Sequence, residues 1–332
     1  MHSQLIRPLR RRQRTSGSDL NLVFLGCGSI AGRQALRLRS LGGVRCGFAS
    51  RDGRRAAEFH QRFRGTRSYG TYESALLDED VDAVAITTPP AQHLPLTLAA
   101  LEAGKHVIVE KPAFLRSADV YRVEAAAADS GCRVLVAENY AYKPLTRVLR
   151  DVITSGEIGE VRYLAVNALK LQRPGGWRDD ESLSGGGALF EGGIHWMHLM
   201  ADVGLTIESV HGFRPDGRDG IERSMLVVVQ YEQGAVGTLH HAWDTASFFR
   251  GLRLSRIYGT RGSVTFESNG LFALVRTRRV RVVLPDLRDI AGYRAMFADF
   301  IGCLRENREP EMTLEHARRD LELVEAAYQS TP

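Results

Sequence analysis

The stretch Leu22-Val-Phe-Leu-Gly-Cys-Gly-Ser-Ile-Ala31 decides the fold of the first part of the chain. Four apolar residues form a short buried strand, and a helical pattern runs from Ile30 to Leu41. Between them stands Gly-x-Gly-x-x-Ala, whose first glycine permits a tight turn and whose second lets a phosphate approach the backbone. Such a turn alone can be purely structural. Between a strand and a helix, it predicts dinucleotide binding at Gly26, Gly28, Ser29, Ile30 and Ala31.

Short apolar runs alternate with helical patterns over the following hundred residues. The runs predict strands at Val44–Ala49, Ala83–Ile86, Val107–Val109 and Val134–Val136, with helices at Arg54–Phe63, Leu94–Ala103 and Ala118–Ala128. Continuous apolar strands joined by helices are typical of a parallel sheet that is buried on both faces. We therefore predict an α/β fold whose N-terminal Rossmann domain, residues 20–138, has a doubly wound parallel sheet.

The second half of the chain is rich in β-type patterns. Strands are predicted at Val161–Leu171, Met225–Tyr231, Gly237–Trp243, Leu252–Ile257, Ser263–Phe266 and Leu271–Leu284, and helices near Gly187–Val203, Tyr293–Glu306 and Leu314–Gln329. This composition predicts an α+β domain over residues 139–312, with a large, open, mostly antiparallel sheet. We expect the helix in residues 313–332 to pack back on the first domain. The open sheet offers a pairing surface, so a homodimer or homotetramer is expected.

The charge is unevenly placed in this chain of 332 residues. Lys and Arg number 44 against 39 Asp and Glu, but five arginines lie between Arg7 and Arg14, and residues 19–332 are balanced. A basic tail over residues 1–19 is either a targeting or anion-binding arm or, as we favour, a poorly ordered terminus. The balanced body argues against a nucleic-acid partner. No apolar run approaches the ~18 residues that span a membrane, and no secretory signal follows the tail. The four scattered cysteines suit a reducing cytoplasm.

The end of the second strand bears on the choice of cofactor. An NAD site usually places an acid there to bind the ribose 2′-hydroxyl. This chain has Ser50 followed by Arg51, which suit a 2′-phosphate, while Asp52 is as well placed to cap the next helix. We predict NADP, with NAD as the alternative.

Four further segments complete a recognisable pattern: Thr87-Thr-Pro-Pro-Ala-Gln-His93, Ala103-Gly-Lys-His-Val-Ile-Val-Glu-Lys-Pro112, Gly156-Glu-Ile-Gly159 and Gly185-Gly-Gly-Ala-Leu-Phe-Glu-Gly-Gly-Ile-His195. With them, the chain from Asn21 to its C-terminal helix resembles the Gfo/Idh/MocA oxidoreductase family. The resemblance implies a catalytic set of Lys, Asp and His, a lysine–proline bond that is often cis, and no required metal. In this chain the set corresponds to Lys111, Glu191 and His195, so Glu replaces the usual Asp. His198 also stands where Asp is usual.

The residues support this chemistry beside the resemblance. Lys111 directly follows a buried strand, at the sheet edge where open α/β sheets bind ligands, and its ammonium can polarise an alcohol or carbonyl oxygen. Glu191 and His195, four apart on a predicted helix, share a face. An imidazole suits a base near neutral pH, and Glu191 would orient it or bind a sugar hydroxyl. A metal site made of Glu191, His195 and His198, with His240 or His241, is a less favoured alternative.

The remaining candidates surround these residues. We assign cofactor binding also to Thr88, Pro89, His93, Glu110 and Lys111; His93 alternatively caps the following helix. Substrate contacts are expected from Asn139, Tyr140, Trp177, Arg178 and His198, with Glu138 and Tyr142 as softer candidates. The loop Pro174–Asp179 carries a Trp-Arg pair that resembles a substrate-facing segment of the family. Packing is the competing explanation for the aromatic residues.

Together these expectations describe an NADP-dependent oxidoreductase. It would move a hydride between nicotinamide and a secondary alcohol or ketone of a sugar, polyol or cyclitol. Two alternatives remain open at this point. One is an enzyme with tightly bound NAD(P) that uses transient oxidation for elimination or glycoside cleavage. The other is a non-catalytic dinucleotide-binding regulatory protein.

Overall fold

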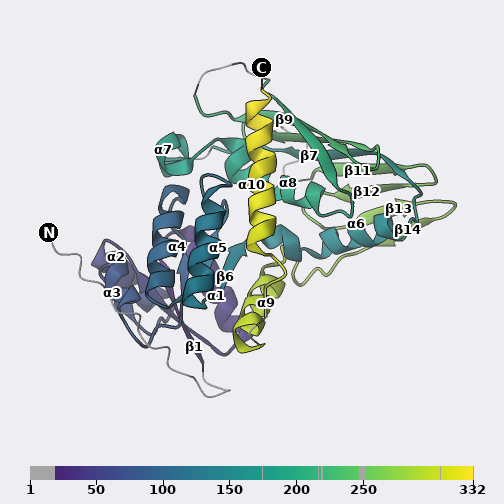
Figure 1. Ribbon diagram of the computed structural model, residues 1–332. Coiled ribbons are helices and arrows are strands. Elements are labelled where there is room, and N and C mark those ends of the chain that lie inside the picture. Colours follow the sequence, from purple (N-terminus) through teal and green to yellow (C-terminus); the bar gives the residue numbers. More distant parts are fainter. Residues whose placement is uncertain are drawn as a thin grey trace. The chain divides into compact units, whose positions relative to one another are not determined.

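The computed structural model describes residues 19–173, 175–215, 217, 220–246, 252–306 and 308–331 (Figure 1). The expectations about the basic tail and about Pro174 therefore lie outside the described residues. The chain forms two compact units. The first comprises Met1–Phe114, Ala118–Ala137 and Phe297–Leu314, and the second comprises Leu115–Ser117, Glu138–Met296 and Glu315–Pro332. The packing of residues 313–332 on the first domain concerns the relation between the units and stays a prediction.

The first unit contains a six-stranded parallel sheet with the order β3-β2-β1-β4-β5-β6. Its strands are β1 (Leu20–Leu25), β2 (Val44–Ala49), β3 (Ser68–Tyr69), β4 (Ala83–Ile86), β5 (His106–Glu110) and β6 (Val134–Ala137). All four residues of β4 are fully buried, as expected for a strand covered on both faces. The predicted doubly wound sheet is confirmed, and the order reverses between β1 and β4, where such folds bind their ligands.

Helices connect the strands of this sheet. They are α1 (Ser29–Leu41), α2 (Gly53–Arg62), α3 (Tyr72–Leu76), α4 (His93–Glu102) and α5 (Asp119–Ser130), with a 3₁₀ turn η1 (Pro90–Gln92). Crossovers between parallel strands are almost always right-handed, so connections that run in opposite directions from β1 and β4 place α1 and α4 on opposite faces. The helices α4 and α5 lie side by side (Figure 1). Folds of this kind bind their ligands at the carboxyl ends of the parallel strands.

The second unit contains an eight-stranded sheet with the order β14-β13-β12-β11-β7-β10-β9-β8. Its strands are β7 (Val161–Leu169), β8 (Ile207–Phe213), β9 (Ser224–Tyr231), β10 (Val236–Ala242), β11 (Leu254–Gly259), β12 (Ser263–Glu267), β13 (Ala273–Arg276) and β14 (Val280–Val283). Among the paired strands, β7 and β10 are parallel and the other pairs are antiparallel. The predicted open, mostly antiparallel sheet is confirmed. A hairpin splits the single strand expected at Leu271–Leu284 into β13 and β14.

Several short helical segments accompany this sheet in the second unit. They are η2 (Asn139–Tyr142), α6 (Pro144–Thr154), η3 (Gly176–Asp179), α7 (Glu181–Ser184), the π-helical turn η4 (Leu189–Gly193) and α8 (Ile194–Ala201). Two longer helices follow, α9 (Tyr293–Glu306) and α10 (Leu314–Gln329), with the predicted bounds. The single helix predicted at Gly187–Val203 is wrong in its first part, because a π-turn precedes α8. The buried residues of α8 contact β10, so this helix rests on the inner face of the sheet.

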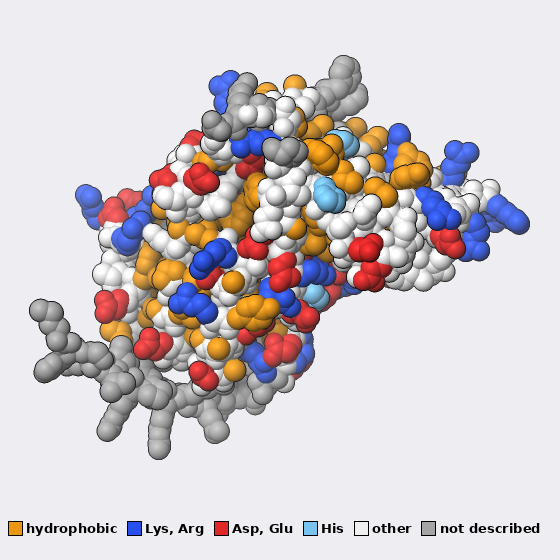
Figure 2. All heavy atoms as spheres, turned by 45° about the horizontal axis from the view of Figure 1, so that its top comes forward, with side chains coloured by type: hydrophobic (Ala, Val, Ile, Leu, Met, Phe, Trp, Pro, Cys, Tyr) orange, Lys and Arg blue, Asp and Glu red, His pale blue; other side chains and the backbone are white. Residues whose placement is uncertain are grey.

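The surface carries charges of both signs. Acidic and basic side chains are interspersed on the face shown in Figure 2, and basic ones project at the tip of the second unit. At that tip the β13–β14 hairpin carries the exposed Arg276, Arg278 and Arg279. None of the helices in the described part of the chain combines the length and the apolar character that a bilayer span requires.

Candidate functional site

The turn between β1 and α1 forms a cradle of bare backbone. Gly26 has φ of +111°, and a Cβ there would lie 3.0 Å from the Thr87 carbonyl oxygen, so a side chain is excluded. Gly28 is the N-cap of α1, no side chain caps the helix, and a Cβ on Gly28 would meet nothing within 4 Å. Ser29 is exposed, Ile30 is half-buried and Ala31 is fully buried in the first turn. The start of α1 is therefore uncapped by a side chain and has open space beside Gly28, as a pyrophosphate needs.

The end of β2 is basic. Ser50 is nearly buried, and its Oγ accepts a hydrogen bond from the Asp52 N–H at 3.2 Å. Asp52 caps α2, because its side chain accepts from the Arg54 N–H at 3.0 Å, which confirms the capping expectation. Arg51 is exposed, and the Arg55 Nε donates to the Cys27 carbonyl at 2.7 Å. The carboxylate of Asp52 is thus engaged in capping α2. Arg55 borders the turn between β1 and α1 through its bond to Cys27.

His93 joins the segments that follow β4 and β5. It is 1% exposed; its Nε2 lies 2.9 Å from the Thr88 carbonyl, and its Nδ1 lies 2.9 Å from the Pro112 carbonyl. Burial lowers the pKa of His93, against the opposing effect of these carbonyls. His93 therefore fixes the backbone around Pro89 and Lys111, and direct contact with a cofactor stays a prediction.

Glu110 and Lys111 stand at the end of β5. Glu110 is the last residue of the strand, and its Oε1 accepts a hydrogen bond from Nε2 of the buried Gln34 in α1. The Lys111–Pro112 peptide bond is cis, as the resemblance implied. Lys111 therefore lies at the carboxyl edge of the parallel sheet, next to a residue that contacts α1.

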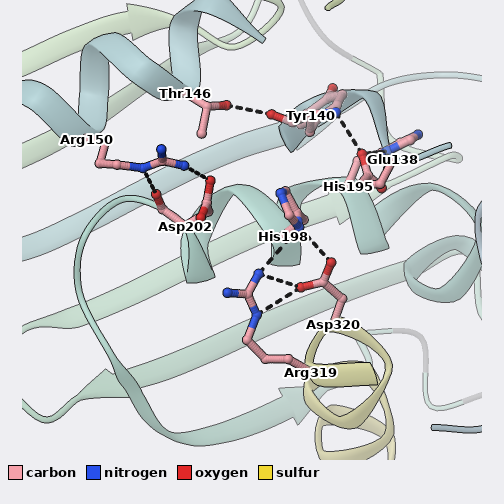
Figure 3. A network of polar contacts seen from close by, with 9 residues as sticks. All are labelled: Glu138, Tyr140, Thr146, Arg150, His195, His198, Asp202, Arg319 and Asp320. Atoms are coloured by element: carbon pink, nitrogen blue, oxygen red, sulfur yellow. Dashed lines mark hydrogen bonds and ion pairs between the residues drawn. The ribbon is translucent and has the colours of Figure 1, made fainter. Parts of the chain in front are cut away.

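In the second unit, His195 is held by Glu138 (Figure 3). The His195 Nδ1 lies 2.6 Å and 2.7 Å from the two carboxylate oxygens of Glu138, which directly follows β6. The Glu138 side chain is 2% exposed and that of His195 is 16% exposed. The Glu138 oxygen also accepts from the Tyr140 N–H at 2.9 Å. The contact with the carboxylate therefore fixes the orientation of the imidazole, with Nδ1 turned toward Glu138.

The charge of this pair is set by its surroundings. Burial alone would raise the pKa of Glu138, but the charge and hydrogen bond of His195 outweigh it and bring the pKa to about 2. The ring of Tyr140 stacks on His195, with centroids 4.7 Å apart, and Trp196 meets the edge of Tyr140 at 5.1 Å. Asn139 is buried and donates to the Ala291 carbonyl at 2.6 Å. Tyr140 thus positions His195, and its predicted substrate contact stays a prediction.

Glu191 is paired with Arg178. The Glu191 Oε1 accepts from Nε of Arg178 at 3.1 Å and from its Nη2 at 3.0 Å. The guanidinium lies 4.3 Å over the Trp177 ring. The structure therefore joins Glu191 to the Trp177–Arg178 pair, which the sequence analysis had selected independently of it. It assigns the orientation of the His195 Nδ1 to Glu138, whereas Glu191 was the residue first expected there.

A buried acid anchors the π-turn that carries Glu191. The Glu222 Oε1 accepts from the Leu189 N–H at 2.7 Å and from the Tyr328 hydroxyl at 2.8 Å, and Tyr328 in turn accepts from the Phe190 N–H at 3.1 Å. A Cβ on Gly187 would lie 1.8 Å from Glu222, so only glycine fits there. Burial raises the pKa of Glu222. The free N–H groups at the start of η4 are satisfied by this carboxyl and hydroxyl.

His198 belongs to a buried ion pair (Figure 3). It is 1% exposed, and its Nδ1 lies 2.7 Å from Asp320 of α10, which Arg319 also contacts at 2.9 Å. Burial would lower the pKa of His198, but the charge and hydrogen bond of Asp320 raise it. Nearby, Arg150 pairs with Asp202 between α6 and the end of α8. These contacts tie α8 to its neighbours, and a substrate role for His198 stays a prediction.

The metal alternative finds no support in the part of the chain that the structure describes, where no group of three or more His, Cys, Asp or Glu could hold an ion. Two contacts escaped the sequence analysis. The Glu138–His195 pair was missed, although the position of Glu138 directly after an apolar strand was a usable signal. The partnership of His198 with Asp320 spans 122 residues and has no local signal. Lys111 lies in the first unit and His195 in the second, so their convergence stays a prediction.

Comparison with known proteins bears on both units. A family model described as oxidoreductase family, NAD-binding Rossmann fold, matches residues 20–138, and a model of the GFO/IDH/MocA C-terminal domain matches residues 146–265. A D-xylose 1-dehydrogenase (NADP(+)) of Haloferax volcanii is 27% identical over 85% of this chain and 88% of its own length. A dTDP-3,4-didehydro-2,6-dideoxy-α-D-glucose 3-reductase of Actinomadura kijaniata is 34% identical over 71% of this chain and 73% of its own.

Solved structures show the same fold. A levoglucosan dehydrogenase in complex with NADH and levoglucosan superposes with a TM-score of 0.84, at 21% identity, over 94% of this chain and 97% of that one. Both family models, the sequence relatives and the two sheets agree with the resemblance found in the sequence. The chain belongs to the Gfo/Idh/MocA family of oxidoreductases.

Proposed function

We propose that this protein is an NADP-dependent oxidoreductase that transfers a hydride between nicotinamide and a secondary alcohol or ketone of a sugar, polyol or cyclitol. The observation that carries the proposal is His195, a partly exposed imidazole whose Nδ1 is bonded to the buried carboxylate of Glu138. An imidazole held by a carboxylate in this way is a common general base, because the carboxylate stabilises the imidazolium that forms when the ring takes a proton. Relatives named for D-xylose and for a dTDP-linked keto sugar favour a sugar substrate.

The residues present fit a dinucleotide. The bare turn at Gly26 and Gly28 and the uncapped start of α1 supply N–H groups for a pyrophosphate. Ser50 and Arg51, with Asp52 engaged in capping α2, suit a 2′-phosphate, which a free carboxylate would repel. When bound, the nicotinamide accepts or returns the hydride. The name of the Haloferax relative includes NADP, which agrees with this choice.

The protein groups handle the proton. In alcohol oxidation, Nε2 of His195 takes the hydroxyl proton, and Glu138 stabilises the imidazolium through its Nδ1 proton. The ammonium of Lys111 donates a hydrogen bond to the same oxygen as it becomes a carbonyl. Glu191, fixed by Arg178, assists by accepting from a neighbouring hydroxyl. In ketone reduction, each proton moves the opposite way.

Turnover of Lys111→Ala tests this assignment. We expect kcat to fall ~10²–10⁴-fold, a far larger change than NADPH titration finds in the Kd, to which Lys111 contributes only as one of several cofactor contacts. Near-normal turnover would refute the role of Lys111. A broad panel of sugars, polyols and cyclitols tests the activity itself. Tight cofactor that copurifies without net redox change would favour elimination or glycoside cleavage instead.

The cofactor preference has its own test. Ser50→Asp places a carboxylate where the 2′-phosphate is expected, so the ratio of NADP to NAD affinity should fall ~10²-fold or more. Calorimetry on both variants and both cofactors measures this ratio. Tighter binding of NAD than of NADP by the unchanged protein would end the NADP proposal.

We further infer that the open sheet pairs with a second copy of the chain. Tyr163 of β7 and Tyr258 of β11 are cross-strand partners, and they are 62% and 40% exposed. Leu254 and Phe213 are also exposed on this sheet, and such apolar surface commonly marks an interface. Light scattering should show a dimer or tetramer, and Tyr163→Arg should shift it toward monomer. A strict monomer at micromolar concentration contradicts the inference.

The proposed location is the cytoplasm. The four cysteines are free and buried, which suits a reducing compartment. Fractionation of the cells that make the protein tests this location.

A further inference from the structure

Two buried polar rings lie on the inner side of β10. His241 belongs to the strand and Trp243 directly follows it; each is 2% exposed. Residues two apart on a strand point to the same face. Leu239 is fully buried on that face, whereas the alternate residue His240 is exposed. Both rings therefore face the layer that contains η4 and α8.

Both rings have an unmet hydrogen bond. Within the described residues, Nδ1 of His241 and Nε1 of Trp243 are buried and have no hydrogen-bond partner. A buried donor or acceptor without a partner opposes folding, and native proteins rarely keep one unless another molecule completes it. The unpartnered Nε1–H of Trp243 in particular points to an acceptor that the described residues do not supply.

Gly192 brings the two rings into one place beside the candidate site. A Cβ on Gly192 would lie 3.3 Å from Nε2 of His241 and 3.4 Å from Nε1 of Trp243. Gly192 follows Glu191 in the π-turn and precedes His195 by three residues. A side chain at this position would press on both rings. The glycine thus keeps a side chain from lying against Nε2 of His241 and Nε1 of Trp243, next to the residues assigned to substrate.

The chemistry of the two rings selects a hydroxyl. Indole Nε1–H can only donate. Burial, with a further contribution from the charge of Lys170, lowers the pKa of His241 to about 3, so its imidazole is neutral and keeps one accepting nitrogen. A hydroxyl group can accept from an indole N–H and donate to an imidazole nitrogen at the same time. A carboxylate could not donate, and an ammonium could not accept.

We propose that His241 and Trp243 form a subsite that binds one hydroxyl group of the substrate, next to Glu191 and His195. This inference rests on the proposed sugar oxidoreductase activity and deepens it. The subsite lies beside the proton-transfer residues, so its effect is on which sugar is accepted and in which orientation. A sugar that lacks this hydroxyl would leave Nε1 of Trp243 and Nε2 of His241 without this partner and bind poorly.

The experiment compares the best substrate of the panel with its monodeoxy analogues, each lacking a different hydroxyl. The unchanged protein should lose ~10–10²-fold in kcat/KM for one analogue because of the two unpaired nitrogens. Trp243→Phe removes the donor and keeps an aromatic ring. It should lose activity with the parent sugar, yet approach the unchanged protein with that one analogue, so the discrimination falls to within ~3-fold.

The control is Thr238→Val, in the same strand with its side chain on the alternate face. It should keep the full discrimination. Discrimination at no single hydroxyl by the unchanged protein overturns the proposal, and this arm needs no variant to fold. An equal loss for every analogue in Trp243→Phe also overturns it, because a buried water or simple packing gives that result. Absence of turnover with every sugar, polyol and cyclitol refutes the proposed function as well, whereas turnover without position-specific discrimination refutes only the subsite.

Discussion

Replacing Glu138 by Gln isolates the charge that supports His195. The side chain keeps its size and one carbonyl oxygen for the Nδ1–H of His195, but it can no longer carry a negative charge. Burial disfavours the carboxylate of Glu138, yet its pKa falls from 4.5 to about 2, largely through His195. That difference corresponds to ~3 kcal/mol. The interaction is reciprocal, so the carboxylate favours the protonated imidazole by a similar order.

The pH dependence of the reaction reports this interaction. Alcohol oxidation needs a neutral His195, so the rate rises with pH as the imidazolium loses its proton. Without the carboxylate the imidazolium is less stable, and the midpoint of this rise should move to lower pH. The plateau of kcat/KM should also fall ~10²–10³-fold, because the imidazolium formed in the transition state loses its support. In ketone reduction, the falling limb should move to lower pH by the same amount.

The assay is kcat/KM from pH 5 to 9.5 in both directions with saturating cofactor. Glu138→Asp keeps the charge at a longer distance and should give an intermediate plateau. Glu267→Gln is the matched control, because Glu267 is a fully buried carboxylate of the same unit that binds Asn269. It should cost stability and leave the midpoint in place. A Glu138→Gln protein whose midpoint and plateau match the unchanged protein would refute the reasoning.

The remaining predictions concern the helix contacts and the cradle. Asp320→Asn should lower the free energy of unfolding by ~3 kcal/mol near pH 6. Burial opposes the charge of His198, but Asp320 raises the pKa of His198. The stabilisation is therefore complete below the pKa of an unfolded histidine, and it is lost as the pH rises through the raised pKa of the folded protein. Urea unfolding at pH 6 and pH 9 measures the free energy of unfolding. The control is Glu322→Gln at an exposed ion pair, which should change this free energy by less than ~0.5 kcal/mol. An equal loss for Asp320→Asn at both pH values contradicts the prediction. Gly26→Ala should destabilise the protein without cofactor by ~1–3 kcal/mol, because φ is +111° and a carbonyl lies 3.0 Å away. Gly28→Ala should leave that stability unchanged and raise the NADPH Kd ~10²-fold, since the new methyl group fills the space expected for the pyrophosphate; thermal unfolding with a fluorescence titration separates the two glycines, and unchanged NADPH binding by Gly28→Ala counts against the cradle.

The fold was readable where burial acts on consecutive residues. Ala83–Ile86 is uniformly apolar because both faces of β4 are covered, and such a run predicts a central parallel strand. The strand Ile207–Phe213 was missed because it has one half-exposed face and several polar residues. The helix Pro144–Thr154 was also missed, although a proline at its first position is an ordinary start signal.

The site was readable only where its chemistry is local. The Gly-x-Gly turn and the end of β5 each occupy a few consecutive residues, so their geometry follows from their own sequence. The pairing of Glu138 with His195 spans 57 residues. Each residue is recognisable as a candidate, but which acid holds the imidazole depends on how η2 packs against α8. Glu191 is nearer to His195 in the sequence, and orienting the imidazole was one of the two roles considered for it. The structure shows that Glu138 holds the His195 Nδ1 instead.

The glycine run Gly185–Gly187, which served as a sign of the family, has a physical explanation in this chain. Gly187 leaves room for the buried Glu222, whose oxygens accept from the Leu189 N–H and from Tyr328. The start of η4 is thereby fixed from outside the helix, and an irregular π-turn can persist there because its free N–H groups are satisfied. The turn then places Glu191 against Arg178, with α8 and its His195 directly following. Two buried acids thus set the site: Glu222 fixes the backbone before it, and Glu138 fixes the imidazole. The methyl group of Gly187→Ala should displace the carboxyl group of Glu222 and loosen the start of η4. The position of His195 should therefore change although the new side chain does not contact it.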